Sequence, residues 1–260
     1  MSGETRTVGR RLAVEWLVFV GVAVGIAASG VWLVSEATDP SAGRRWLLVA
    51  GTVLAYEVGF LAYHLPRARD GVRGPVPRGT LGAANAVTLV RGVLFAGAAG
   101  FLLVPPSSPL VRWAPGVCYG AGAALDYVDG ILARRRGRTT ELGTRLDHAF
   151  DTLGFLVAPL VGVAWGRLPV WYLSLSAARY VFRAGRAWRL STGRRVDPLP
   201  ESRLRRRLAA FQMAFITVAL LPVVPSSIVH PAAAVALAPS LTVFARDWLV
   251  VAGHLPQRED

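Results

Sequence analysis

Eight apolar stretches, each long enough to cross a bilayer as a helix, limit the fold of this 260-residue chain more than any other feature. A helix rises about 1.5 Å per residue, so about 20 mostly apolar residues span a hydrocarbon core of about 30 Å. The predicted spans are Leu12–Val34, Trp46–Leu65, Ala84–Val104, Trp113–Leu132, Leu146–Trp165, Leu168–Leu190, Leu208–Val224 and Ile228–Val251. A water-exposed domain of this length cannot bury so much apolar surface, and we therefore expect an all-α integral membrane protein.

Charge divides the segments between these stretches into two kinds. The chain carries a formal net charge of +13, and its basic residues are all arginines. They concentrate in the N-terminal tail and in every second loop, at residues 67–78, 134–138 and 189–207, whereas the other loops carry few or balanced charges. Arginine-rich loops mark the cytoplasmic side of a membrane protein. The pattern predicts eight spans with both termini cytoplasmic. It argues against nucleic-acid binding, which would need these arginines on a soluble scaffold.

A basic segment with three prolines divides the predicted spans into two groups. We expect a two-helix transmembrane extension over residues 1–65, a cytoplasmic linker over 66–83 and a six-helix membrane domain over 84–255. Glu57 interrupts the apolar sequence of the second span. Its carboxyl either snorkels or pairs with a neighbour, or it has a function, because carboxyl groups inside membranes are rare.

Four aspartates lie within 26 residues of a chain in which acids are scarce. Asp126 and Asp129 are three residues apart, and Asp147 and Asp151 are four apart, so each pair shares one face of its helix. A short loop joins the two helices, which must run antiparallel and bring both pairs to the cytoplasmic end. Converging carboxylates repel one another, and hard divalent cations such as Mg²⁺ or Mn²⁺ relieve that repulsion. We expect a two-metal site for a phosphoryl or diphosphate group. The alternative is a set of solvated acids paired with the arginine-rich loop.

These acids belong to a longer pattern, D-x2-D-G-x2-A-R-x8-G-x3-D-x3-D. It is met at all eight fixed positions, which are Asp126, Asp129, Gly130, Ala133, Arg134, Gly143, Asp147 and Asp151. In this pattern the chain resembles the CDP-alcohol phosphotransferases, also called CDP-alcohol phosphatidyltransferases, whose core is a six-helix membrane bundle. The resemblance covers about Ala84 to Val251. It implies transfer of the phosphatidyl-type group of a CDP-linked lipid to an alcohol acceptor, with release of CMP, in phospholipid synthesis. It also implies a homodimer and a multi-pass enzyme of the cell membrane, with its active site at the cytoplasmic face.

The same resemblance implies a role for each residue of the pattern. Asp126, Asp129 and Asp147 would hold the metal ions. Asp151 would complete the metal site and act as the base that takes the proton of the acceptor hydroxyl. The residues that would contact the CDP portion are Gly130, Arg134, Thr140 and Gly143.

The third predicted span adds a polar face. Asn85, Thr88 and Arg91 follow one another at intervals of three. They resemble the N-x2-T-x2-R element that precedes the signature in many members of the family and helps to form the nucleotide pocket. We therefore expect Asn85 and Thr88 to bind CDP. The alternative is hydrogen bonding between helices, which Asn and Thr often provide in membranes.

Arginines inside two predicted spans indicate the acceptor. Arg179 and Arg183 share a helical stripe in the sixth span, and Arg246 lies in the last. Arginine within a span is costly and usually faces the bundle interior or a polar cavity. We expect these side chains to bind a phosphorylated polyol such as glycerol phosphate or inositol phosphate. Snorkelling to lipid headgroups is the alternative interpretation, and an unphosphorylated acceptor such as serine is the alternative substrate.

Two other classes of function compete with an enzyme. A cation-coupled membrane transporter would place its acids near the middle of the bilayer on discontinuous helices, whereas the acids here gather at one membrane face. A catalytically silent scaffold would be expected to lose fixed positions of the signature, and none is lost. We therefore favour the enzyme.

Overall fold

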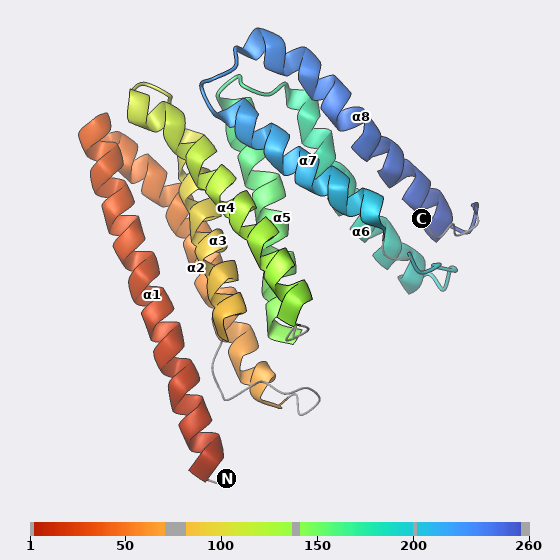
Figure 1. Cartoon of the computed structure of the whole chain (residues 1–260), viewed down its shortest axis with the longest axis horizontal. Helices are drawn as coiled ribbons and strands as arrows, with labels where there is room; N and C mark the ends of the chain where they lie inside the picture. Colours follow the sequence, from red (N-terminus) through yellow and green to blue (C-terminus); the bar gives the residue numbers. More distant parts are fainter. Residues whose placement is uncertain (1–2, 71–81, 137–140, 200–201, 256–260) are drawn as a thin grey trace.

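The computed structural model describes residues 3–70, 82–136, 141–199 and 202–255, and within these ranges it consists of helices and their connections. In chain order the helices are α1 (Gly3–Ala37), α2 (Pro40–Asp70), α3 (Gly82–Ala99), the 3-10 helix η2 (Gly100–Leu103), α4 (Pro109–Arg136), α5 (Glu141–Ala164), the 3-10 helix η3 (Val170–Leu173), α6 (Ser174–Ser191), α7 (Arg203–Leu220) and α8 (Ser226–Val251). The long helices alternate in direction along the chain (Figure 1). The predicted all-α architecture is confirmed.

Five helical segments are long and apolar enough to cross a membrane. They are Arg11–Ala37, Pro40–His64, Asn85–Leu103, Leu142–Ala164 and Ser226–Val251. The other three predicted spans fall on α4, α6 and α7, where aspartates or arginines lower the hydropathy of the sequence. The described part of the chain is consistent with a multi-pass membrane protein, and the eight-span topology stays a prediction.

Helix α2 is longer at both ends than the predicted second span. It starts earlier because Asp39 caps its first turn, where the carboxylate accepts hydrogen bonds from the amides of Ser41 (2.8 Å) and Ala42 (3.0 Å). The Ser41 hydroxyl also donates to this carboxylate, and these hydrogen bonds lower the pKa of Asp39. At its other end α2 continues into the predicted linker 66–83, whose residues 71–81 lie outside the described residues.

Trp46 attaches the first two helices to the rest of the molecule. Its ring fills the space left by two glycines, since a Cβ at Gly30 of α1 would lie 2.2 Å from the ring and a Cβ at Gly100 would lie 2.4 Å from it. The indole N–H donates to the Gly97 carbonyl of α3 at 3.1 Å, which satisfies this donor inside an apolar core. The α1–α2 hairpin therefore packs directly against α3 and η2.

A phenylalanine sets the spacing of the three central helices. Phe95 of α3 is buried between Gly122 of α4 and Gly154 of α5. A Cβ at Gly122 would lie 2.6 Å from the Phe95 ring, and one at Gly154 would lie 2.7 Å from it, which is closer than real Cβ contacts allow. Each glycine lies about one turn from an acid of the predicted site, Asp126 or Asp151. The close packing of this ring therefore fixes the separation of the helices that carry the acids.

Candidate functional site

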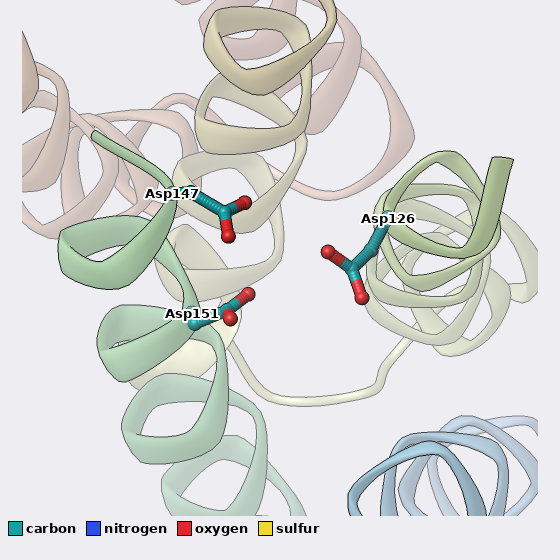
Figure 2. A group of neighbouring side chains, drawn as sticks. All are labelled: Asp126, Asp147 and Asp151. Carbon is teal, nitrogen blue, oxygen red and sulfur yellow. The ribbon is translucent and has the colours of Figure 1, made fainter. Parts of the chain in front are cut away.

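Three of the four predicted metal ligands come together between α4 and α5. Asp126 on α4 faces Asp147 and Asp151 on α5, and the three carboxylates point toward one another (Figure 2). One oxygen of each carboxylate lies within 4.8 Å of the corresponding oxygens of the other two. The side chains are half-buried, with exposed fractions of 34% for Asp126, 46% for Asp147 and 28% for Asp151. Asp129 lies on the same helix as Asp126, and its side chain is outside the described residues.

Arg91 of α3 reaches the centre of this cluster. Its guanidinium donates to the Asp126 carboxylate and, at 2.6 Å, to the Asp147 carboxylate, and it lies 3.1 Å from Asp151 Oδ1. The nitrogen that contacts Asp147 also donates to the backbone carbonyl of that residue at 3.3 Å. Arg91 is 1% exposed. Three acids thus share one buried cation, and its charge offsets the repulsion that would otherwise drive them apart.

The spacing of Arg91 from Asn85 and Thr88 places the three residues on one broad face of α3 and predicts that Arg91 lies near the site. It does not predict that Arg91 contacts the three acids. Asn85 and Thr88 are both buried, with exposed fractions of 5% and 3%. The spacing cannot show that α3 packs against α4 and α5 at once, and this packing is what lets one side chain contact acids from both helices.

The geometry of the three carboxylates fits a divalent cation. Carboxylate oxygens are preferred ligands of Mg²⁺ and Mn²⁺, and oxygens on opposite sides of one Mg²⁺ are about 4.2 Å apart. The separations of up to 4.8 Å are therefore close to those of a shared ion. Because the side chains are half-exposed, water or substrate oxygens have access to the remaining coordination positions. The cluster could therefore bind a metal ion.

The other residues predicted from the signature lie at the same ends of α4 and α5. Gly130 and Arg134 fall in the last two turns of α4, where the side chains lie outside the described residues. Gly143 is half-buried in the first turn of α5. Thr140 lies outside the described residues. Their contacts with CDP stay a prediction.

A cavity of about 220 Å³ lies between α5, α6, α7 and α8. Phe155, one turn beyond Asp151 on α5, forms part of its wall, and the guanidinium of Arg179 lies over the Phe155 ring at 4.5 Å from the ring centre. Arg205 of α7 and Asp247 of α8 also line the cavity and form an ion pair at 3.0 Å. The wall thus combines apolar side chains with charged groups.

A buried amide contributes the deeper polar part of this wall. Gln212 accepts a hydrogen bond from the Tyr172 hydroxyl and donates to the Ala236 carbonyl (2.6 Å) and to the Ser240 hydroxyl (2.9 Å). Isolated polar residues of this kind have no spacing that would mark them in the sequence.

The three predicted acceptor residues occupy different surroundings. Arg179 lines the cavity, whereas Arg183 is exposed and Arg246 is half-buried. Arg183 and Arg246 are not among the described residues that line the cavity. The cavity therefore supports a role for Arg179 more directly than for the other two.

Comparison with known proteins gives these residues a context. A family model described as "CDP-alcohol phosphatidyltransferase" matches residues 81–244, which is more than half of the chain. The matched region holds α3 to α7 and most of α8, and with them Arg91 and the three clustered carboxylates. It leaves out α1 and α2, and therefore Glu57.

Relatives of the chain are named as transferases or synthases. A "CDP-diacylglycerol--glycerol-3-phosphate 3-phosphatidyltransferase" of Yersinia enterocolitica is 37% identical over 117 residues, which cover 42% of this chain and 60% of that protein. A protein of the same name from Yersinia pestis (strain Pestoides F) gives the same values. A "Cardiolipin synthase (CMP-forming)" of Streptomyces coelicolor is 44% identical over 55 residues, which cover 21% of this chain and 25% of that protein. The chain thus matches less than two thirds of the length of these relatives.

Proposed function

The chain belongs to the CDP-alcohol phosphatidyltransferase family, and we propose that it transfers the phosphatidyl-type group of a CDP-linked lipid to an alcohol acceptor. The acceptor oxygen forms a bond to the phosphorus that carries the lipid, and the bond from that phosphorus to the oxygen of CMP breaks. The hydroxyl proton goes to a base, and CMP leaves. The observation that carries this proposal is the convergence of Asp126, Asp147 and Asp151 on one cation-binding centre within the matched region.

We propose that the metal is Mg²⁺ or Mn²⁺, as two ions held by Asp126, Asp129, Asp147 and Asp151. When bound, such ions offset the negative charge of the diphosphate and of the leaving CMP. Oxygen ligands at the observed spacing, from half-exposed side chains, support this proposal.

Asp151 is the proposed base. A carboxylate within hydrogen-bond reach of a hydroxyl can take its proton as the oxygen attacks. Phe155, which lies one turn beyond Asp151 on α5, lines the cavity. The side chain of Asp151 as a whole is 28% exposed, although its Oδ1 atom is buried.

The CDP portion is proposed to bind where α3, α4 and α5 meet beside the acids. Gly130 lets the ligand approach the α4 backbone closely, and Arg134 can pair bidentately with a phosphate. The further proposed contacts are Asn85, Thr88, Thr140 and Gly143. Asn85 and Thr88 are buried on the helix that carries Arg91.

The proposed acceptor is a phosphorylated polyol such as glycerol phosphate or inositol phosphate, bound in the cavity between α5, α6, α7 and α8. Arg179 offers a cation in the cavity wall, and Arg183 and Arg246 are further proposed contacts. The printed names of the Yersinia relatives include glycerol-3-phosphate as the acceptor, which favours this substrate class over an unphosphorylated alcohol such as serine.

We also propose a membrane arrangement for the enzyme. Helices α1 to α8 would cross the cell membrane with both termini in the cytoplasm and the active site at the cytoplasmic face. Residues 84–255 would form a six-helix catalytic domain behind the extension 1–65 and the linker 66–83, with a homodimer as the working unit. The alternating helix directions (Figure 1) and the arginine-rich loops support this arrangement.

Replacing Arg179 tests the acceptor assignment. Arg179→Gln removes the cavity-wall cation, and we expect the KM for glycerol phosphate to rise about 10- to 100-fold with a smaller change in kcat, because a charge-assisted contact to the phosphate is lost. Arg112→Gln, which changes an exposed arginine at the start of α4, should leave the KM unchanged. The measurement is CMP release against acceptor concentration. Use of serine or free inositol, with rejection of their phosphate-bearing counterparts, would contradict the assignment.

A further inference from the structure

We propose that Arg91 is a resident cation of the carboxylate cluster that exchanges with the divalent metal, so that it keeps the acids assembled and lowers their affinity for the ion. The inference rests on the metal site of the proposed function, and it concerns a residue to which neither the signature nor the family match gives this role.

Arg91 and a metal ion would compete for the same three carboxylates. The guanidinium contacts the Oδ1 atom of each of the three aspartates, Asp126, Asp147 and Asp151. These three residues are the described ones whose carboxylate oxygens lie close enough together to hold an ion. A guanidinium carries donors and cannot be a metal ligand. A metal ion bound by all three carboxylates therefore competes with Arg91 for their lone pairs.

The charge of Arg91 also opposes binding of a metal ion. Three carboxylates supply three negative charges, and Arg91 offsets one of them within a nearly closed space, since it is 1% exposed. The remaining negative charge still attracts a divalent ion, but each ion that enters also meets the guanidinium. Repulsion between like charges a few ångströms apart is weakly screened in such surroundings. Arg91 therefore opposes binding of the ion while it reduces the mutual repulsion of the acids.

Arg91 can give up these contacts while α3 keeps its place. The carboxylates are between 28% and 46% exposed, so the cluster opens toward solvent on one side. The arginine side chain is long, so rotation about its own bonds can move the guanidinium away from the carboxylates while the backbone of α3 stays packed. By this account Arg91 is a positioning residue, because it acts on substrate through the three acids.

Metal binding without substrate tests the exchange. Arg91→Gln removes the competing charge, and Arg91→Lys keeps the charge on a head group that cannot contact three carboxylates together. Titration with Mn²⁺, followed by loss of the free-ion electron paramagnetic resonance signal, should show tighter binding in Arg91→Gln by about 5- to 150-fold. Arg91→Lys should fall between the two. Arg167→Gln is the matched control, because Arg167 binds the backbone carbonyls of Ala219, Leu221 and Val224 and has no described contact with the acids.

Thermal unfolding provides a second readout that does not depend on turnover. In chelator, Arg91→Gln should unfold at a lower temperature than the unmodified protein, and Mg²⁺ should raise its unfolding temperature by more than it raises that of the unmodified protein. If Arg91→Gln cannot be purified, the Mn²⁺ affinity of Arg91→Lys decides the matter. Equal or weaker Mn²⁺ binding in the Arg91 variants would overturn the exchange. Failure of the unmodified protein to release CMP would instead overturn the proposed function and leave the Mn²⁺ result standing.

Discussion

The molecule holds its acids in two contrasting ways within a short distance of α3. Asp126, Asp147 and Asp151 are half-exposed and share Arg91 of that helix. Glu57 of α2 is fully buried, and neither of its oxygens has a hydrogen-bond partner among the described residues. Its carboxyl packs against Gly92 of α3, because a Cβ added at Gly92 would lie only 2.9 Å from it.

The difference shows what makes an acid useful in this fold. The clustered acids are compensated by a cation and open to solvent, so a ligand can reach them and replace their partner. Glu57 lies among apolar side chains such as Leu54 and Leu61, its neighbours along the same face of α2, and no described opening leads to it. Burial of an unpaired carboxyl costs free energy without offering a binding position. We infer that the three clustered aspartates take part in the chemistry, whereas Glu57 lowers the stability of the α1–α2 hairpin.

Removing the proposed base tests whether the clustered aspartates carry the chemistry, and it has the largest expected effect on the rate. Asp151→Asn keeps the shape of the side chain but cannot take a proton, so CMP release should fall by about 10²- to 10⁴-fold. Asp39→Asn, at an exposed carboxyl that caps α2, should leave the rate within about twofold, since Asn is also a good helix cap. CMP formed per minute by each purified variant is the readout. A normal rate in a folded Asp151→Asn variant would place the base elsewhere.

The packing that supports the cluster should be the next most sensitive feature. In Gly154→Ala the new Cβ would lie 2.7 Å from the Phe95 ring, so α5 or the ring must move. We expect a loss of about 1–3 kcal/mol of stability from overpacking. A shift of Asp151 by about 1 Å should lower CMP release up to about 100-fold.

Gly25→Ala is the matched control for this change, because a Cβ there meets nothing within 4 Å. It should keep full activity and gain up to about 1 kcal/mol from the better helix propensity of alanine. The unfolding temperature and the rate of CMP release are measured on both variants. If Gly154→Ala behaves like Gly25→Ala, the ring does not set the position of the acids.

Replacing Glu57 should have the smallest effect, and it should raise stability where the other changes lower stability or activity. Glu57→Met fills a similar volume without polar oxygens, so stability should rise by about 1–2 kcal/mol while CMP release is retained. Glu57→Gln is the matched control: it keeps an unpaired polar group in the same place and should gain little. Unfolding temperatures in detergent, with activity on the same samples, decide the outcome. Loss of activity in a stable Glu57→Met variant would show that Glu57 takes part in the reaction, and would contradict the distinction drawn between Glu57 and the three aspartates.

The sequence predicted the parts of this arrangement that depend on spacing along one helix. The intervals of three and four residues place acids on common faces, and the short connection between two helices makes them antiparallel, which is enough to bring Asp126 near Asp147 and Asp151. The helical segments followed from apolar length. Charge in α4, α6 and α7 is what keeps these three helices from qualifying as spans by composition.

The features that the sequence did not reveal depend on contacts between helices. Arg91 contacts acids from two other helices because Phe95 and the glycines around it hold α3, α4 and α5 at a particular spacing. Glu57 was visible as an odd residue, but its lack of a partner depends on which apolar side chains surround it. Gln212 joins a cavity wall made by four helices. No local sequence pattern determines these contacts, because they depend on how whole helix faces pack together.

Product analysis by mass spectrometry tests the central claim most directly. The purified protein would be supplied with a CDP-diacylglycerol donor, a panel of glycerol phosphate, inositol phosphate, free inositol and serine, and either Mg²⁺ or a chelator. The account predicts CMP together with a lipid in which the phosphatidyl group is joined to one of the phosphorylated polyols, formed with Mg²⁺ and absent with the chelator. Lipid product that forms equally well in chelator, or no CMP release with any acceptor, would contradict it.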